Sequence, residues 1–417
     1  MTRPRTIPFY LAAAALLTAA APTPDSPARL EWSDLNRRPD GNARLSALGT
    51  DAQGRPVLAW TESGAAGSGQ GTYALRLEAG RWSLLGGEQP GGNLNEDARH
   101  NAAQLTLAVG QDGAPALGWA EDSGTAHVDS YLTSRYDGAS WSPPGAYAVR
   151  RNLSDAGRSR AFVPGPGGLP LIAWTNIYFP GAEGSVVQLL SWNGKGFDSS
   201  EPLNRSLKRT AFFPSIGQRR GGVDDGDGAA GEGTLVAWLE GNVAASNVYV
   251  SLRQGKRWQA LGGALNVRPN TYTFAPQLRL NVQGNPLVVW QEDWRGADNL
   301  YLKRWTGTSW EALGGSLNHD PRRLAERPAL ALDAAGDPVV AWSEERGGDQ
   351  HAVYARRWKN GRWTLLGQAA VRRGALSGDG DALSASVTVA GNGQVLVSWC
   401  ERVGQTYHLR VRTFGAS

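Results

Sequence analysis

The sequence predicts an all-β fold, a seven-bladed β-propeller built from four-stranded antiparallel blades. Composition supports this first, because the 417 residues include 54 Gly, 23 Pro and 17 Trp, which favours turns and large aromatics over a helical protein. A motif of tryptophan, any residue and usually glutamate occurs seven times. Around each copy, short segments rich in Val, Leu, Tyr and Trp alternate with turn residues. Repetition at this spacing is typical of propellers and solenoids.

The seven copies of the tryptophan motif set the length of the repeat. They are Trp60–Glu62, Trp119–Glu121, Trp174–Asn176, Trp238–Glu240, Trp290–Glu292, Trp342–Glu344 and Trp399–Glu401, separated by 52 to 64 residues. Pro lies four residues before the tryptophan in five copies, and Gly lies six residues before it in six copies. These residues predict a tight turn that enters the motif strand.

The sixth copy shows the whole unit, RPALALDAAGDPVVAWSEERGGDQHAVYARRWKNGRWTLLG, at residues 327–367. Its four apolar segments are separated by hairpin-sized turns, which predicts one antiparallel sheet of four strands. A single sheet of this size cannot bury both of its faces. Seven sheets arranged radially can, because each face packs on the next blade.

The two ends of the chain favour closure into a ring. The last copy stops at its third strand, 409–414, and a candidate fourth strand lies near the N-terminus at Ala28–Trp32, just before Leu35 and Asn36. Such a shared blade would leave no open sheet edge. Eight blades or an open solenoid remain alternatives to seven blades.

The N-terminal segment has the layout of a secretory signal peptide. Arg3 and Arg5 precede an apolar run from Ile7 to Leu17, followed by small residues and a Pro-rich spacer. We therefore expect a signal peptide at 1–21, a linker at 22–27 and the propeller at 28–417. We expect a secreted or periplasmic protein with no membrane span after cleavage, and the run is too short and Ala-rich for an anchor.

Charge and cysteine content exclude some classes of partner and cross-link. The net charge of +4 is small for this length and gives no argument for nucleic acid, so we expect no nucleic-acid partner. Cys400 is the only cysteine, so the chain forms no intramolecular disulfide and has no cysteine at the cleavage site for lipid attachment.

The loops from strand four to strand one, and from strand two to strand three, should emerge on one face. We expect these to be the long, variable loops that carry binding residues. Trp294, in the blade-five loop beside Arg295, is the one tryptophan that the repeat does not explain. It could stack on a sugar ring or a partner, or it could cover its own loop. Tyr178 and Phe179 in blade three, and Tyr272 before blade five, are predicted on the same face.

Charged residues on this face have a structural and a functional interpretation. Every loop from strand four to strand one carries Arg, and six motif strands end in Glu. The structural interpretation is a ring of Arg–Glu and Glu–backbone contacts that hold the loops. In the functional interpretation, arginines of this face bind a carboxylate or phosphate. These arginines are Arg158, Arg160, Arg205 and Arg209.

Signals for metals, cofactors and catalysis are weak. Asp224, Asp225 and Asp227 lie in a Gly-rich insertion, where they could bind Ca²⁺ or belong to a solvated loop, but their spacing is not that of an EF-hand. We expect no other cofactor. The sequence contains no G-x-S-x-G, H-E-x-x-H or Walker A motif. Carboxylates gathered from different blades remain a route to glycan cleavage, with Glu292, Asp293, Glu344 and Glu345 as the candidates.

The repeated unit, followed by Leu-Asn, resembles the tandem propeller repeat of secreted bacterial proteins described as sialidase-like or Kelch-like. The resemblance covers residues 30 to 414 and implies a propeller of the sialidase-like superfamily. The sialidase Asp box, S-x-D-x-G-x-x-W, is not matched by Asp333 to Gly336 with Trp342. The sequence therefore favours a non-enzymatic, monomeric binding or scaffold protein that contacts a protein or a cell-envelope polysaccharide. A lectin-like propeller and a sialidase-like enzyme are the alternatives.

Overall fold

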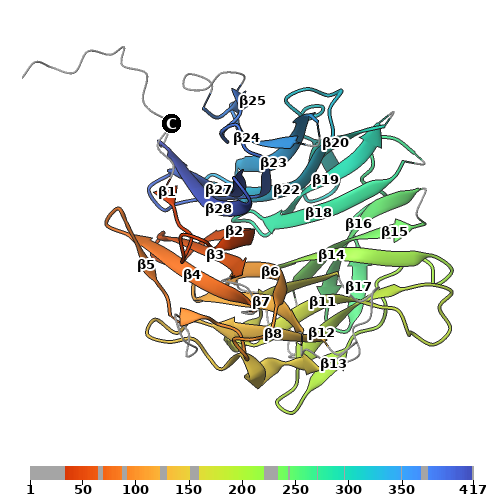
Figure 1. Cartoon of the computed structure of the whole chain (residues 1–417). Coiled ribbons are helices and arrows are strands. Elements are labelled where there is room, and N and C mark those ends of the chain that lie inside the picture. Colours follow the sequence, from red (N-terminus) through yellow and green to blue (C-terminus); the bar gives the residue numbers. More distant parts are fainter. Residues whose placement is uncertain are drawn as a thin grey trace, which may run out of the picture.

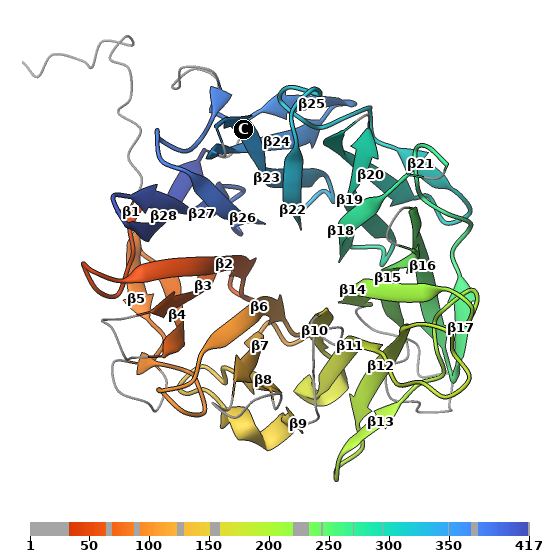
Figure 2. The same ribbon diagram turned by 45° about the vertical axis from the view of Figure 1, so that its right-hand side comes forward.

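The protein is a ring of seven four-stranded antiparallel sheets, as the sequence predicts (Figures 1 and 2). The computed structural model describes residues 33–63, 69–86, 92–122, 129–150, 159–219, 233–242, 245–269, 271–294, 296–348, 350–367 and 374–415, with the backbone alone at positions 129, 150 and 294. The predicted signal peptide and linker lie outside these residues. Within the described ranges, no apolar helix has the length needed to cross a membrane.

The innermost strands follow one another around the central opening in Figure 2. They are β2 (Asn42–Thr50), β6 (Ala102–Val109), β10 (Arg160–Pro164), β14 (Thr210–Gln218), β18 (Thr273–Leu280), β22 (Ala325–Leu332) and β26 (Ala382–Val389). The second strands, which carry the tryptophan motif, are β3 (Pro56–Ser63), β7 (Pro115–Asp122), β11 (Pro170–Asn176), β15 (Thr234–Gly241), β19 (Pro286–Trp294), β23 (Pro338–Gly347) and β27 (Val395–Val403).

The third and fourth strands complete the blades toward the outside. The third strands are β4 (Gln70–Glu78), β8 (Asp129–Arg135), β12 (Val186–Trp192), β16 (Ser246–Gln254), β20 (Ala297–Trp305), β24 (Gln350–Lys359) and β28 (Thr406–Phe414). The fourth strands are β5 (Arg81–Leu84), β9 (Val149–Arg150), β13 (Phe197–Ser199), β17 (Arg257–Ala260), β21 (Trp310–Ala312), β25 (Arg362–Leu365) and, in blade seven, β1 (Ser33–Asp34). Two short 3-10 helices, η2 (Pro144–Tyr147) and η3 (Pro166–Gly168), lie in loops.

The motif tryptophans form the centre of the packing between blades. Six of them have no exposed surface, and Trp174 of blade three is 6% exposed. Each blade interface has its own apolar cluster; the cluster between blades five and six joins Val289 and Leu300 to Trp342 and Val340. Packing of both sheet faces on neighbours explains why the second strands read as continuous apolar runs.

The predicted turn before the motif strand is confirmed. In blade one, Gly54 has φ of +76° and donates its N–H to the carbonyl oxygen of Asp51 at 2.9 Å. The Gly54 carbonyl accepts an N–H from Gly391 of blade seven at 2.8 Å, and a Cβ at Gly54 would lie 2.6 Å from the Gly391 Cα. Only glycine fits there, because the two turns touch through their backbones.

The N-terminal and C-terminal segments lie side by side in blade seven. β1 pairs with β28 through Ser33 with Val411 and Asp34 with Arg410, and the Leu35 N–H donates to the Leu409 carbonyl oxygen at 3.0 Å. The predicted closing strand, Ala28–Trp32, lies outside the described residues. The first pairing that the structure describes begins directly after it.

Blade two departs from the regular blade, and one expectation about loop length is wrong. Trp141 does not lie in the fourth strand of blade two; it forms an isolated bridge with Tyr136, and the strand appears later as β9. Pro143 and Pro144 follow Trp141 and lack the N–H groups that a continuing strand needs. In addition, the connections from strand two to strand three are not all long. Residues 295–296, 348–349 and 404–405 are the whole connections in blades five, six and seven.

Candidate functional site

Each tryptophan motif with glutamate forms the same internal hydrogen bond. The indole Nε1 donates to Oε2 of the glutamate two residues later, on the same side of the strand. The distances are 2.9 Å (Trp60 to Glu62), 3.0 Å (Trp119 to Glu121), 3.3 Å (Trp238 to Glu240), 3.0 Å (Trp290 to Glu292), 2.8 Å (Trp342 to Glu344) and 3.1 Å (Trp399 to Glu401). The six glutamates are buried, at most 4% exposed.

Five of these carboxylates also hold the loop that arrives from the preceding blade. Each accepts two consecutive backbone N–H groups at 2.7 to 3.0 Å. The donors are Arg37 and Arg38 for Glu62, Glu96 and Asp97 for Glu121, Arg205 and Ser206 for Glu240, Val267 and Arg268 for Glu292, and His319 and Asp320 for Glu344. The predicted Glu–backbone contacts are thus confirmed. Burial raises the pKa of Glu62 and Glu344, against these hydrogen bonds, which lower it.

The side-chain amide of the asparagine in the Leu-Asn element hydrogen-bonds to the backbone of the third strand, as a neighbouring strand would. Its side-chain oxygen accepts an N–H, and its Nδ2 donates to the carbonyl two residues earlier on that strand. Asn36 binds Leu409 and Tyr407, Asn95 binds Thr72 and Gln70, Asn204 binds Val187 and Ser185, Asn266 binds Val248 and Ser246, and Asn318 binds Leu300 and Asp298. Asparagine thus anchors the loop to one blade and glutamate to the next.

The loop arginines have partners other than the motif glutamates. Arg99 pairs with Asp97 at 2.6 Å and Arg322 with Asp320 at 2.9 Å, in each case within the same loop. Side-chain hydrogen bonds from Arg322 lower the pKa of Asp320 to about 2. These pairs replace the predicted Arg–Glu ring at these loops, because the glutamates already accept backbone N–H groups.

The inner strands carry a repeated irregularity at the end that follows these loops. A β-bulge interrupts the pairing of the first and second strands in every blade except blade three. In blade three, Arg160 pairs directly with Trp174. We define the mouth ring as Arg160 plus the first bulged residue of each other blade: Arg44, Gln104, Arg160, Phe213, Ala275, Arg327 and Ser384. Residues further along each of these strands, and Arg160 itself, line the central channel.

The backbone is strained at five of these seven positions. Non-glycine residues there have a positive φ: Gln104 (+53°), Phe213 (+49°), Ala275 (+47°), Arg327 (+50°) and Ser384 (+57°). This conformation costs of order 1–3 kcal/mol for a non-glycine residue, and bulges turn a side chain away from the regular strand alternation. The bulges therefore present one side chain from each of six blades at one mouth of the channel, and its residue type varies among the blades.

Cations occupy the part of the mouth ring around blades one to three. Arg44 is exposed, and its guanidinium lies 5.3 Å from the centre of the Tyr407 ring. Arg160 donates to Gln104 Oε1 at 3.3 Å and lies over the Tyr131 ring at 5.4 Å. Together they give this sector hydrogen-bond donors and positive charge.

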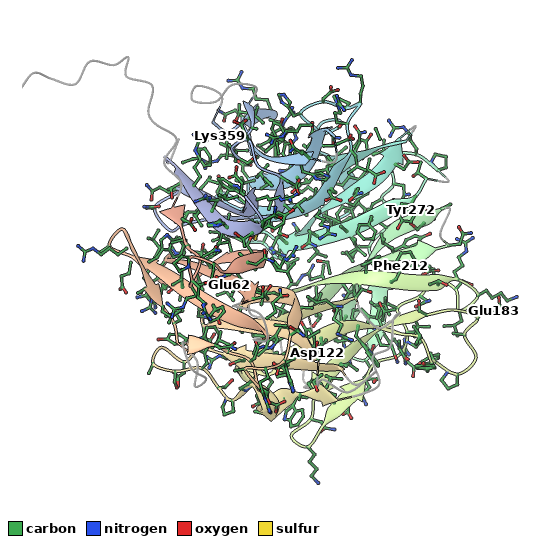
Figure 3. The ribbon with its side chains drawn as sticks, viewed as in Figure 1. Glu62, Asp122, Glu183, Phe212, Tyr272 and Lys359 are labelled. Atoms are coloured by element: carbon green, nitrogen blue, oxygen red, sulfur yellow. The ribbon has the colours of Figure 1, made fainter. Side chains whose placement is uncertain are left out.

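Aromatic side chains occupy the part of the mouth formed by blades four and five. The Phe213 ring packs edge to face on Phe274 at 4.4 Å and on Phe212 at 5.4 Å, and Tyr272 stacks on Phe274 at 6.3 Å. Phe212 and Tyr272 are labelled in Figure 3. The predicted residue Tyr272 thus joins an aromatic cluster at the mouth, suited to contact a sugar ring or an apolar group.

Carboxylates gather between blades five and six beside exposed Arg327. Gln291 Nε2 donates to Asp298, and the Arg327 N–H donates to Gln291 Oε1 at 3.4 Å. Burial raises the pKa of Asp298, and the charges of Asp293 and Glu326 add to this effect. The predicted acid–base candidates Glu292 and Glu344 are not available for catalysis, because their oxygens hold an indole and two backbone N–H groups.

A histidine–aspartate–tyrosine cluster lies between blades six and seven. Asp381 accepts the backbone N–H of His351 at 2.8 Å, contacts its Nδ1 at 3.0 Å and accepts the Tyr407 hydroxyl at 2.7 Å. Burial opposes ionisation of Asp381, but these hydrogen bonds outweigh it and lower its pKa. Tyr407 connects the cluster to Arg44 of the mouth ring.

The remaining predicted binding residues that the structure describes lie in the blade-three loop, in the loop from blade three to blade four, and at the end of β19. Tyr178 is 69% exposed in the blade-three loop, and Phe179 beside it is half-buried. The Arg205 side chain donates to the Gly262 carbonyl at 2.8 Å and covers the Tyr249 ring, while Arg209 is exposed. Trp294 ends β19, its backbone paired with Ala297. Its side chain lies outside the described residues, as do Arg295, Arg158, Asp224, Asp225 and Asp227.

Sequence reasoning missed most of the mouth ring, although the repeat contained a signal for it. Gln104, Ala275, Arg327 and Ser384 each precede the motif tryptophan by fifteen residues. Proline follows three ring residues, Phe213, Ala275 and Arg327. In these four copies the residue type varies while the distance to the tryptophan is constant. Among the described residues, no group of three or more His, Cys, Asp or Glu side chains is placed to hold a metal.

Comparisons with known proteins establish the fold and nothing finer. No protein family and no curated protein matches this chain. Solved structures resemble it at low identity: a prolyl endopeptidase (TM-score 0.50, 11% identity, 90% of this chain and 48% of that one), an ulvan lyase (0.49, 12%, 91% and 94%) and a Hadza microbial sialidase (0.44, 11%, 90% and 66%). This chain spans about half the length of the endopeptidase. At 11% identity this likeness shows a shared fold and nothing about activity or ligand.

Proposed function

We propose that this protein is a secreted binding propeller that holds an acidic polysaccharide of the cell envelope at the mouth ring. The observation that carries the proposal is the repeated bulge, which places one side chain from each of six blades, with Arg160 from the seventh, at the channel mouth. A structural position that is constant while its residue type varies is free to serve recognition. Backbone strain at five of these positions supports the same conclusion.

The chemistry of the mouth favours an acidic sugar polymer. Arg44 and Arg160 offer cationic donors on one side, and Phe213, Phe274 and Tyr272 offer an aromatic surface on the other. A uronic acid residue combines a carboxylate with an apolar ring face, so it complements both sectors. A long polymer also suits an open mouth, because successive sugars can extend over the variable loops.

A binding role is preferred to catalysis because of how the carboxylates are used. The motif glutamates of five blades hold backbone N–H groups and indoles, as the geometry above describes. Asp298 supports glycan cleavage as a second candidate function, because its raised pKa suits a general acid and Glu326 lies close enough to affect its charge. Turnover of a bound polysaccharide, lost in Asp298→Asn, would favour this second candidate.

The test is a binding screen of the mature chain against acidic and neutral envelope polysaccharides and a glycan array. We expect a polymer that contains uronic acid to bind, and we expect Phe213→Ala to weaken it by about tenfold, as one lost stacking contact predicts. Trp294→Ala is measured in parallel, because the sequence predicts that this indole could stack on a sugar ring. A folded wild-type chain that binds no polysaccharide would overturn the proposal and direct the search to protein partners.

A further inference from the structure

The central channel contains one residue that departs from the other six blades. The strand register aligns seven inner-strand residues, because each pairs with the residue that follows the start of the second strand. They are Gly49, Ala108, Val163, Gly217, Arg279, Ala331 and Thr388, and all seven line the channel. Six blades have a small or β-branched side chain at this level, and blade five has arginine.

Tight packing between blades explains why the residues at this level are small. A Cβ added at Gly217 would lie 2.7 Å from Leu278 Cδ2 of the next blade, and one at Gly49 would lie 3.1 Å from Leu107 Cδ2. A long side chain at this level cannot stay between the sheets, so the Arg279 side chain extends into the channel. The Arg279 side chain is accessible to solvent in the channel. Protein nevertheless surrounds it on all sides, and the resulting desolvation lowers the pKa of Arg279.

The Arg279 guanidinium has few partners in the described part of the chain. Its one hydrogen bond runs from Nη1 to the carbonyl oxygen of Leu278 at 2.9 Å. The described lining of the channel includes Arg160 as the other charged residue and contains no Asp or Glu. Gln277 lies two residues earlier on β18, lines the same channel and brings an amide. A guanidinium and an amide therefore face one solvent-filled space without a carboxylate from the described lining.

We propose that the channel binds an oxyanion, a carboxylate or phosphate group, at Arg279 and Gln277. The cavity measures about 450 Å³, within the range of roughly 300–1,000 Å³ typical of small-molecule sites. Arg279 lies four residues beyond Ala275 of the mouth ring, or about 13 Å along the strand. The site is thus deeper than the mouth and accepts a free small anion whether or not a polymer binds above it.

Calorimetric titration at constant ionic strength tests the site with inorganic phosphate, glucuronate and uncharged glucose as probes. We expect saturable binding of an oxyanion, no binding of glucose, and at least about a tenfold loss in Arg279→Ala, because charge-assisted hydrogen bonds are the strong ones. Arg257→Ala, which removes an exposed arginine from the outer strand β17, is the matched control and should keep wild-type affinity. If glucuronate binds more tightly than phosphate, the ligand is a carboxylate; if phosphate binds more tightly, the ligand is a phosphate.

Two results would overturn this inference. The first is a wild-type chain that binds neither phosphate nor glucuronate, as would follow if a carboxylate of the chain itself held the guanidinium. The second is an equal loss in Arg257→Ala and Arg279→Ala, which would mean that general charge attracts the anions. If Arg279→Ala fails to fold, Gln277→Ala gives the same test, with weakened binding of the anion expected in a folded variant.

Discussion

Blades six and three show two uses of the same motif. In blade six, Glu344 accepts the Trp342 indole and two N–H groups of the loop from blade five. In blade three, Asn176 replaces the glutamate; it donates to Gln188 within its own blade and accepts the N–H of Tyr178. The side chain two residues after the tryptophan therefore holds either the loop that arrives from the preceding blade or the loop of its own blade. The second use gives the blade-three loop, residues 177–185, that exposes Tyr178.

The mouth of the channel differs between these blades in the same way. Blade six has a bulge that presents Arg327 with a positive φ, whereas β10 and β11 of blade three pair without interruption. In the six blades with a bulge, the repeated tryptophan and glutamate form a fixed frame, and one residue at the mouth of the channel varies. Blade three lacks both the motif glutamate and the bulge, and it has an exposed loop instead.

The largest expected effect is loss of a motif tryptophan. Trp342→Ala should lower the free energy of unfolding by about 3–5 kcal/mol, because it leaves a large cavity between blades five and six. Urea denaturation followed by far-UV circular dichroism measures it. Trp192→Ala, at a half-buried third-strand position in blade three, is the comparison and should cost less. Equal losses of stability in the two variants would contradict the central place of Trp342 in the packing between blades five and six.

The next effect tests the loop lock of blade six. Glu344→Ala should cost about 2–3 kcal/mol, because it leaves the buried indole N–H and two backbone N–H groups without an acceptor. The neighbouring Glu345→Ala should stay within about 0.5 kcal/mol, since surface ion pairs contribute little and the Glu345 side chain makes, in the described part of the chain, a single 3.8 Å ion-pair contact with Arg323. A loss in Glu345→Ala as large as in Glu344→Ala would show that the lock is not the cause.

A smaller effect concerns pH and the cluster between blades six and seven. The lowered pKa of Asp381 means that the unfolded chain takes up this proton at a higher pH than the folded chain. Its contribution to stability is thus present above the unfolded pKa and is lost as the pH falls below about 4. We expect the melting temperature of the wild type to fall more steeply below pH 4 than that of Asp381→Asn. If the two melting temperatures fell in parallel below pH 4, Asp381 would not be the cause of the loss of stability in acid.

No effect at all is expected for thiol reagents on the folded chain. Burial raises the pKa of Cys400 to about 12, and the side chain is 1% exposed in blade seven. The thiolate is the reactive form, so an alkylating reagent at pH 8 should label the protein only in denaturant. Labelling without denaturant, at a rate above that of global unfolding, would show that blade seven opens alone.

The sequence predicts the frame well because the frame repeats. Spacing of tryptophan, glutamate, proline and asparagine is set by strand pairing and by packing between blades, which act identically in each copy. The mouth ring could not be predicted in the same way, since Arg327 and Ala275 share a backbone conformation and no side-chain chemistry. Exposed aromatics such as Tyr178 stand out in a sequence, whereas a bulge residue is recognised only from the strand register.

The measurement that tests the central claim compares two pairs of arginines on the same face. Arg44→Ala/Arg327→Ala removes two exposed charges of the mouth ring, neither of which has an ion pair in the described part of the chain. Arg99→Ala/Arg322→Ala removes two exposed loop charges that are paired with Asp97 and Asp320. Titration with the acidic polysaccharide from the screen should show a loss of at least about tenfold for the first pair and wild-type affinity for the second. Wild-type affinity in the mouth-ring variant would contradict the claim that the mouth ring is the recognition site.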